Sequence, residues 1–281
     1  MRAMYQRTDG ASVRCLLCPH GCLIHHDRVG KCLARLNEGG VLFAKSYARA
    51  SSLALDPIEK KPLYHFNSGT NILSVGSYGC NMFCNFCQNW EISNREVPTT
   101  YLPPEHLAKL SFNAGPDNIG VAFTYNEPFI GFEYLMDCAK LLKKQGQCTV
   151  LVTNGMINKD PLLELAPFID AANIDLKCFS PETYRELGGD LETIKQTIEL
   201  GAERFHVEVT THIVPGMNDN PEQIEEIARW LASLNPEIPY HVSRFLPTHK
   251  MVDAQPTPVE EIYAFADIAR KYLRYVYTGN C

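Results

Sequence analysis

The sequence predicts a mixed α/β fold, a partial (β/α)6 TIM-like barrel with a small Cys-rich N-terminal extension. Two observations support this prediction. From residue 71 onward, short β-branched or apolar runs alternate with segments of helical apolar spacing, as in right-handed βαβ units on a parallel sheet. Before residue 71, clustered cysteines, glycines and charges are mixed with short apolar runs. We therefore expect an extension over residues 1–70 and a barrel core over residues 71–281.

The elements follow in order along the chain. In the extension, Val41–Tyr47 is expected as a strand and Asp56–Pro62 as a polar loop. The core strands are expected at 71–76, 119–124, 148–152, 170–176, 204–214 and 240–246, each an apolar or β-branched run. A closed (β/α)8 barrel needs eight such units and about 250 residues, so about six units favour a partial barrel.

The helices between these strands are marked by their ends. They are expected at 104–113, 129–145, 160–167, 180–201, 221–234 and 258–273. Prolines open the first, Gly146 ends the second and Asp160 caps the third. The Gly188–Gly189 pair interrupts the fourth, and Asn220 caps the fifth.

Composition narrows the classes of function. The chain has 281 residues, 45% of them hydrophobic, and a net charge of −6, so we expect no nucleic-acid partner. No apolar run approaches the roughly 18 residues that cross a bilayer, and Met1–Arg14 lacks the apolar core of a signal peptide. We expect a cytoplasmic protein with no membrane partner.

The 11 cysteines are unusual in number and arrangement. Cys80, Cys84 and Cys87 form a C-x3-C-x2-C loop directly after the first core strand. Three thiolates can hold three irons of a [4Fe-4S] cluster and leave the fourth iron open for a substrate-like cofactor. A structural zinc site would offer four ligands, and no fourth follows at a suitable spacing.

A C-x3-C-x2-C loop after the first strand, with Phe86 before its last cysteine, resembles the signature of the radical S-adenosylmethionine (SAM) superfamily. The resemblance implies that Cys80, Cys84 and Cys87 hold the cluster and that SAM binds its open iron. It further implies that one electron, from a donor such as flavodoxin or ferredoxin, cleaves SAM to a 5′-deoxyadenosyl radical that abstracts hydrogen from a substrate.

Residues at the carboxyl ends of the next strands are expected to contact SAM, since ligands of parallel barrels bind there. The resemblance places a G-G-E-P-like segment after the second strand, where this chain has Tyr125, Asn126 and Glu127 before a proline, and therefore a different local turn. Thr153 and Asn154, with the following glycine, are similar to a segment of activating enzymes of glycyl-radical enzymes. A plain helix cap and a plain turn are the alternatives at these two positions.

Asp175 and Lys177 alternate with apolar residues, so both point to one face of the fourth strand. Buried there, they must be paired or liganded; they form a salt bridge or contact the ribose and carboxylate of SAM. Their D-L-K sequence resembles pyruvate formate-lyase-activating enzyme, as do the V-P-G-x-x-D ending of the fifth strand and the L-P-x-H ending of the sixth. His249 in that last ending is a candidate contact, and His241 is a weaker one.

The extension carries a second cysteine group. Cys15, Cys18, Cys22 and Cys32 are spaced C-x2-C-x3-C-x9-C. This pattern could hold zinc or a second iron–sulfur cluster, or it could be a compact loop of free thiols.

The L-C-P-H-G-C and G-K-C-x-x-R segments, with T-Y-N-E-P, resemble the radical SAM enzymes of the AmmeMemoRadiSam system. Members of this group commonly continue with a cysteine-containing tail, so the end at Cys281 suggests a truncated or shorter chain. The resemblance implies hydrogen abstraction like that of glycyl-radical-enzyme activating enzymes, with a protein as a candidate substrate. The alternatives are radical modification of a small molecule or non-glycyl protein site, and a non-catalytic zinc-binding scaffold.

Overall fold

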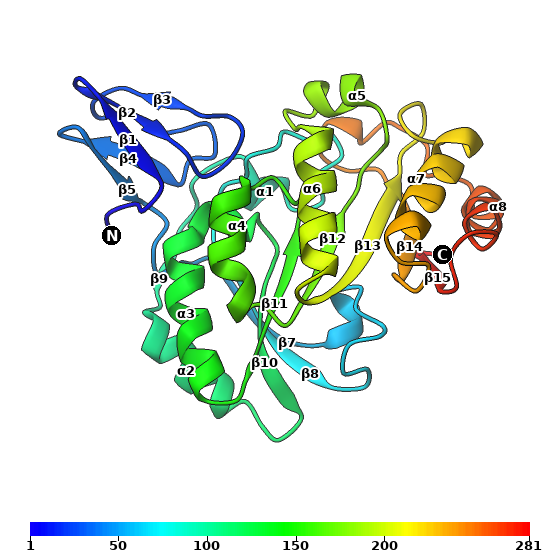
Figure 1. Cartoon of the computed structure of the whole chain (residues 1–281), viewed down its shortest axis with the longest axis horizontal. Helices are drawn as coiled ribbons and strands as arrows, with labels where there is room; N and C mark the ends of the chain where they lie inside the picture. Colours follow the sequence, from blue (N-terminus) through cyan, green and yellow to red (C-terminus); the bar gives the residue numbers. More distant parts are fainter.

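The computed structural model describes residues 1–281 and is built on one eight-stranded sheet (Figure 1). All strands but one run parallel. The exception, β7 (Ser52–Pro57), pairs antiparallel with β8 at one edge. From that edge the sheet continues through β8 (Asn71–Gly76), β10 (Asn118–Phe123), β11 (Cys148–Thr153), β12 (Ala171–Asp175), β13 (His206–Ile213), β14 (Tyr240–Arg244) and β15 (Val276–Gly279).

Helices cover one face of this sheet. Figure 1 shows α3, α4, α6 and α7 side by side across it. Their apolar sides pack on outward-facing strand residues such as Val121, Leu151 and Ile174, which belong to the main core. The helices are α1 (Trp90–Ser93), α2 (Pro104–Phe112), α3 (Phe132–Lys144), α4 (Lys159–Leu165), α5 (Pro181–Glu186), α6 (Leu191–Ala202), α7 (Pro221–Leu234) and α8 (Val259–Ala269). Four 3-10 turns complete the set: η1 (Ile58–Lys60), η2 (Pro128–Gly131), η3 (Ala166–Phe168) and η4 (His249–Met251).

The other face of the strands has its own small core. Ile72, Ala122, Val150 and Ala171, from four neighbouring strands, pack with Ile58 and Leu63 from the segment after β7. The segment from η1 to Leu63 therefore covers the inner face of the curved sheet. The architecture is the expected α/β partial barrel, with helices outside and a plugged interior.

Most predicted elements are present. Strand β15, the strand Thr100–Tyr101 and all strands of residues 1–50 other than Val41–Ala44 were not predicted. Asp56–Pro62 was expected as a loop, whereas Asp56 and Pro57 end β7. Strand β7 was not predicted because its leucines, Leu53 and Leu55, are exposed rather than buried. Asp160 does not cap α4, whose N-cap is Asn158.

The predicted cap at Asn220 is confirmed, since its side chain accepts hydrogen bonds from two backbone N–H groups of α7. The expected break at Gly188–Gly189 lies between α5 and α6. Gly146 follows α3 with a left-handed φ of 68°, as a helix-ending glycine does.

Residues 1–50, the N-terminal module below, form small antiparallel sheets beside the barrel (Figure 1). β1 (Gln6–Asp9), β2 (Ser12–Cys15) and β3 (Leu23–Ile24) make one, and β4 (Arg35–Glu38) and β5 (Val41–Ala44) make a hairpin. β6 (Arg49–Ala50) pairs with β9 (Thr100–Tyr101) of the core. The expected boundary at residue 70, between the N-terminal extension and the barrel core, stays a prediction. No helix is long and apolar enough to span a bilayer.

Candidate functional site

The C-x3-C-x2-C loop leaves the carboxyl end of β8 and leads into α1. Cys80, Cys84 and Cys87 are half-buried free thiols. Asn154, at the end of β11, directs its amide to Cys80 Sγ at 3.5 Å and to Asn81 Oδ1 at 2.9 Å. Asn81 in turn donates to the carbonyl of Met156 at 2.7 Å. The loop is thus fastened to the neighbouring strand end.

Asn126 holds the start of the same loop. Its Oδ1 accepts a hydrogen bond from the N–H of Ser77 at 2.7 Å, and its Nδ2 donates to the carbonyls of Tyr78 and Gly79 at 3.2 and 3.1 Å. Orphan backbone groups of a loop need such partners. The side chain of this predicted SAM contact therefore binds the cysteine loop.

Glu127 joins the ends of β10 and β11. Its buried carboxylate accepts hydrogen bonds from Phe129 N at 2.9 Å, Thr153 Oγ1 at 2.7 Å and Asn154 N at 2.8 Å. Burial raises its pKa to about 7 in spite of these donors. Thus Glu127, Thr153 and Asn154, three residues predicted from separate strand ends, form one hydrogen-bonded unit beside the cysteine loop.

Tyr125 adopts the left-handed backbone that a glycine would favour, with φ of 70°. Its hydroxyl donates to Asp56 Oδ2 at 3.0 Å, and Lys61 Nζ lies 2.9 Å from the same oxygen. A Cβ on Gly76 would come within 2.9 Å of the Tyr125 ring, so the ring needs glycine beside it. The expectation of a different local turn at this position stays a prediction. Asp56 and Lys61 were not predicted as site residues, since nothing in their polar segment indicated burial.

Burial and charge set the protonation of this group. Although burial opposes it, hydrogen bonds from Lys61 and Tyr125 hold the pKa of Asp56 well below its ordinary value. Burial lowers the pKa of Lys61, against the attraction of Asp56. The pair is a buried ion pair on the inner face of the sheet, and removing one partner would leave a costly isolated charge.

Asp175 and Lys177 lie at the end of β12 and form the salt bridge that the sequence analysis considered, at 3.0 Å. Lys177 Nζ also lies 5.9 Å from the centre of the Phe86 ring in the cysteine loop. Burial would lower the pKa of Lys177, but Asp175 and Cys84 raise it above its usual range, so the side chain stays charged. Burial raises the pKa of the Cys84 thiol to about 11, and Lys177 opposes this shift.

The two histidine candidates lie in different places. His249, in η4, stacks on Trp90 with ring centres 5.1 Å apart, and its Nε2 lies 3.3 Å from Asn94 Nδ2. It therefore lies over α1, just after the cysteine loop. His241, near the start of β14, is bound to the buried Glu208 at 2.6 Å.

His212 is a site residue that sequence reasoning missed. It lies on β13, stacked against Phe86, and its buried Nε2 has no hydrogen-bond partner. Burial, and then the nearby Lys177, lowers its pKa to about 4. A signal was present in the alternation of His206, Glu208, Thr210 and His212, which share one face of the strand.

The donor set fits a [4Fe-4S] cluster with one open iron. The loop supplies three free thiols and no fourth cysteine. A cationic Lys177 and the Asn154 amide stand beside the sulfurs, as donors to cluster thiolates do. The unpartnered Nε2 of His212 leaves a polar group free for a ligand in the adjoining interior.

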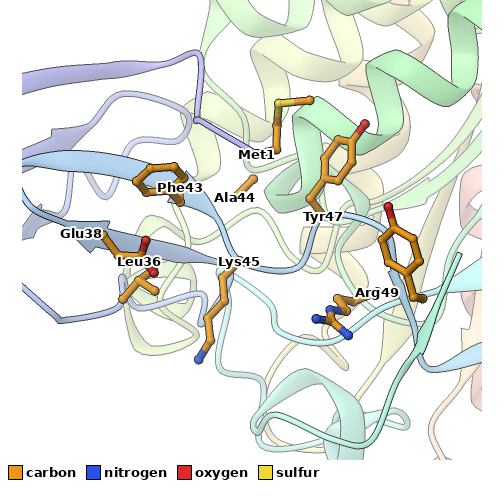
Figure 2. Close-up of a pocket in the computed structure, with 9 residues that line it drawn as sticks. Met1, Leu36, Glu38, Phe43, Ala44, Lys45, Tyr47 and Arg49 are labelled. Carbon is orange, nitrogen blue, oxygen red and sulfur yellow. The ribbon is translucent and has the colours of Figure 1, made fainter. Parts of the chain in front are cut away.

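A surface hollow of about 540 Å³ lies elsewhere, on the N-terminal module. Figure 2 shows its lining, with Phe43 and Lys45 from the β4–β5 hairpin region and Tyr47 and Arg49 beyond it. None of the cysteines, strand-end residues or histidines above contributes to it. It has no part in the candidate site.

Comparison with known proteins agrees with this geometry. The family model described as the radical SAM superfamily matches residues 74–231. The chain is 38% identical over 282 residues to an uncharacterised protein of Methanocaldococcus jannaschii, covering 98% of this chain and 84% of that protein. It is 28% identical over 176 residues to the pyruvate formate-lyase 1-activating enzyme of Escherichia coli, covering 58% of this chain and 71% of that enzyme.

The fold also matches a solved structure. The structure of TYW1 with a lysine-pyruvate adduct bound superposes with a TM-score of 0.54 and 18% identity. The match covers 79% of this chain and 83% of TYW1. At that identity the likeness concerns the fold alone.

Proposed function

The chain belongs to the radical SAM superfamily and is therefore an enzyme of [4Fe-4S] and SAM chemistry, and we propose that it abstracts hydrogen from a glycine of a protein partner. In this proposal Cys80, Cys84 and Cys87 hold the cluster. When bound, the cluster and SAM supply a one-electron cleavage that yields the 5′-deoxyadenosyl radical. The electron comes from a flavodoxin- or ferredoxin-like donor.

The residues of the chain itself provide binding and order. Asn126 and Asn154 hold the cysteine loop against the ends of β10 and β11. Glu127 locks those two strand ends together, so that the backbone near Thr153 faces the cofactor in one conformation. Rigid placement of this kind lowers the barrier by fixing reactants before the chemical step.

Asp175, Lys177 and His249 are proposed to contact SAM as well. The lysine keeps its charge beside Cys84 and can bind an anionic group such as a carboxylate. Its partner Asp175 is more exposed, at 35% of its side chain, and can accept from hydroxyls. Tyr125 would act through its backbone, since its hydroxyl is engaged by Asp56.

The observation that carries the glycyl assignment is the Asp175–Lys177 pair beside Phe86 of the cysteine loop, in a chain 28% identical to a pyruvate formate-lyase 1-activating enzyme. The D-L-K sequence supports an activating-enzyme arrangement at this strand. Membership of an enzyme family argues against a non-catalytic zinc scaffold.

Two measurements test the proposal. The protein is isolated anaerobically, reconstituted with iron and sulfide, reduced with dithionite and supplied with SAM, and 5′-deoxyadenosine is measured. We expect its formation, at a rate that Lys177→Met lowers at least tenfold, with the exposed Lys250→Met as a matched control. The absence of 5′-deoxyadenosine from a fully loaded enzyme would overturn the radical SAM assignment to this chain.

The glycyl target is tested separately. Proteins that co-purify with the chain are incubated with the reduced enzyme and SAM, and the products are examined by EPR. A glycyl radical signal in the partner supports the proposal. Turnover with a small molecule, or a radical on another residue, contradicts the glycyl target while leaving SAM cleavage intact.

A further inference from the structure

The cysteines of the N-terminal module surround one small cavity. Cys15, Cys18, Cys22 and Cys32 all line it, although they come from separate turns of the chain. All four are free thiols. The cavity has a volume of about 10 Å³, the room of a single water molecule.

The backbone is folded to bring these thiols together. Cys15 N donates to the carbonyl of Cys22 at 2.9 Å, which places the two residues side by side. Gly21, in a left-handed conformation, makes the turn between Cys18 and Cys22. Leu33, next to Cys32, has φ of 66°, a strained value for leucine that persists only where the surroundings hold it.

A buried cation faces the same cavity. Arg35 also lines it, with 2% of its side chain exposed. Its Nη1 donates to Glu133 at 2.6 Å, whereas its Nε and Nη2 are buried without any partner. Unpaired N–H groups of a buried guanidinium are costly, and thiolates bound to a cation would accept from them.

We propose that Cys15, Cys18, Cys22 and Cys32 bind one Zn²⁺ ion as a structural tetrahedral site, with the free N–H groups of Arg35 donating to the thiolates. Four thiols lose four protons on binding, so the site carries a charge of −2 beside the arginine. The site is independent of the proposed radical chemistry.

The donor set is that of a closed structural zinc site. Four cysteine thiols line the cavity, and four thiolates complete the tetrahedral coordination of one Zn²⁺ with no open position. His20 lines the cavity too, and its Nε2 lies 2.7 Å from the carbonyl oxygen of Asn81. The four cysteines make a complete tetrahedral set without it.

The thiols must turn inward to bind. No three ligand-type side chains of the chain, in this module or in the Cys80 loop, lie at single-ion spacing. Rotation about χ1 moves a thiol sulfur without moving the backbone, and the proposed site closes by such rotations. The N–H groups of Arg35 would gain their acceptors in the same step.

Metal analysis tests the site. The full chain, isolated anaerobically, is expected to hold about one zinc per chain in addition to iron. A variant with Cys80→Ala, Cys84→Ala and Cys87→Ala is expected to keep the zinc and lose the iron. Adding Cys18→Ser to that variant removes the zinc, and adding the exposed Cys281→Ser instead does not.

Cobalt provides a second readout. Zinc is removed from the triple-alanine variant with a chelator and replaced by Co²⁺. A tetrahedral tetrathiolate site gives strong visible d–d bands and near-ultraviolet sulfur-to-cobalt charge transfer. This measurement uses the four wild-type ligands, so it holds even if Cys18→Ser fails to fold.

Arg35→Lys tests the second part of the proposal. Lysine keeps a cation for Glu133 but cannot offer the two free guanidinium groups, so zinc affinity in chelator competition should fall 10- to 100-fold. Unchanged affinity would remove the arginine from the site. Absence of zinc, or iron with acid-labile sulfide in the triple-alanine variant, would overturn the zinc site itself.

Discussion

At the residue scale, the role of Cys84 as a cluster ligand is the firmest prediction that the sequence permits. Cys84→Ala leaves two thiolates in the loop, too few to hold three irons of a cubane. We expect the iron content and the brown absorbance to be lost and 5′-deoxyadenosine formation to be abolished. Cys148→Ala, on β11, is the matched control, and a variant at Cys84 that retains a full cluster would contradict the assignment.

Burial makes His212 a second informative residue. Its folded-state pKa of about 4 lies below the ordinary value of 6.5, so the unfolded chain binds this proton more readily. Stability is therefore expected to fall as the pH drops from about 6.5 to about 4, by as much as about 3 kcal/mol. His212→Gln removes this contribution and should flatten the urea-stability profile over that window.

The exposed His26→Gln is the control for the pH series, since its side chain is 58% exposed. It should follow the wild-type profile. Parallel profiles for the wild type and His212→Gln would mean that His212 titrates normally. The measurement needs no cofactor, so it reports on the environment of the histidine alone.

Single residues were predictable where chemistry alone requires them. Three cysteines within eight positions predict a cluster site. The spacing of Asp175 and Lys177 predicts that both side chains lie on the same face of one strand. His212 was not singled out, although it shares one strand face with His206, Glu208 and Thr210, because such alternation alone does not show which of these side chains faces the site. Asp56 and Lys61 were missed because their burial depends on Tyr125, 69 positions after Asp56.

At the scale of elements, the cysteine loop depends on close contact with the N-terminal module. Gly79 has φ of 88°, and a Cβ there would lie 2.2 Å from the carbonyl oxygen of Cys32. His20 also reaches this loop through the carbonyl of Asn81. The module therefore packs directly on the residue that precedes Cys80.

Gly79→Ala should disrupt the packing of the N-terminal module on the cysteine loop. We expect a loss of about 2–4 kcal/mol in the free energy of unfolding, from backbone strain and the clash together, and a lower iron content per chain. Gly39→Ala is a matched control, since Gly39 has φ of 58° but nothing within 4 Å of its Cβ position. Equal losses in the two variants would show that the close contact is unimportant.

Glu127 gives a test of how the strand ends are joined. Glu127→Gln offers only one acceptor oxygen, and its amide N–H₂ would face the backbone N–H of Asn154. We expect a loss of about 1–3 kcal/mol, measured by urea unfolding, and weaker SAM binding. Glu164→Gln, at the surface, should have little effect, and unchanged SAM affinity in Glu127→Gln would argue against the proposed role of these strand ends.

Element boundaries were predicted well where both faces of a strand or one face of a helix are apolar. The bounds of β8 and α7 agree with the expected ranges. β7 was missed because an edge strand with exposed leucines carries no buried stripe, and β15 because it is four residues long. Short edge strands form by pairing with a neighbour, which local sequence does not encode.

At the scale of the whole molecule, the segment after β7 joins the first 70 residues to the barrel. Leu63 is fully buried in the same small core as Ala122 and Val150. β7 forms its whole ladder with β8. The extension predicted for residues 1–70 thus contributes an edge strand and an interior plug to the sheet that carries the site.

Leu63→Ala tests whether the plug and the barrel unfold together. Both tryptophans, Trp90 and Trp230, lie outside residues 1–70, so their fluorescence reports on the barrel. A buried leucine truncated to alanine costs about 2–5 kcal/mol, and we expect the fluorescence-detected urea midpoint to fall accordingly. Leu55→Ala, whose leucine is 47% exposed, should leave it nearly unchanged. If residues 1–70 fold as an independent unit, Leu63→Ala will shift the circular-dichroism transition of that unit alone and leave the tryptophan transition where it was.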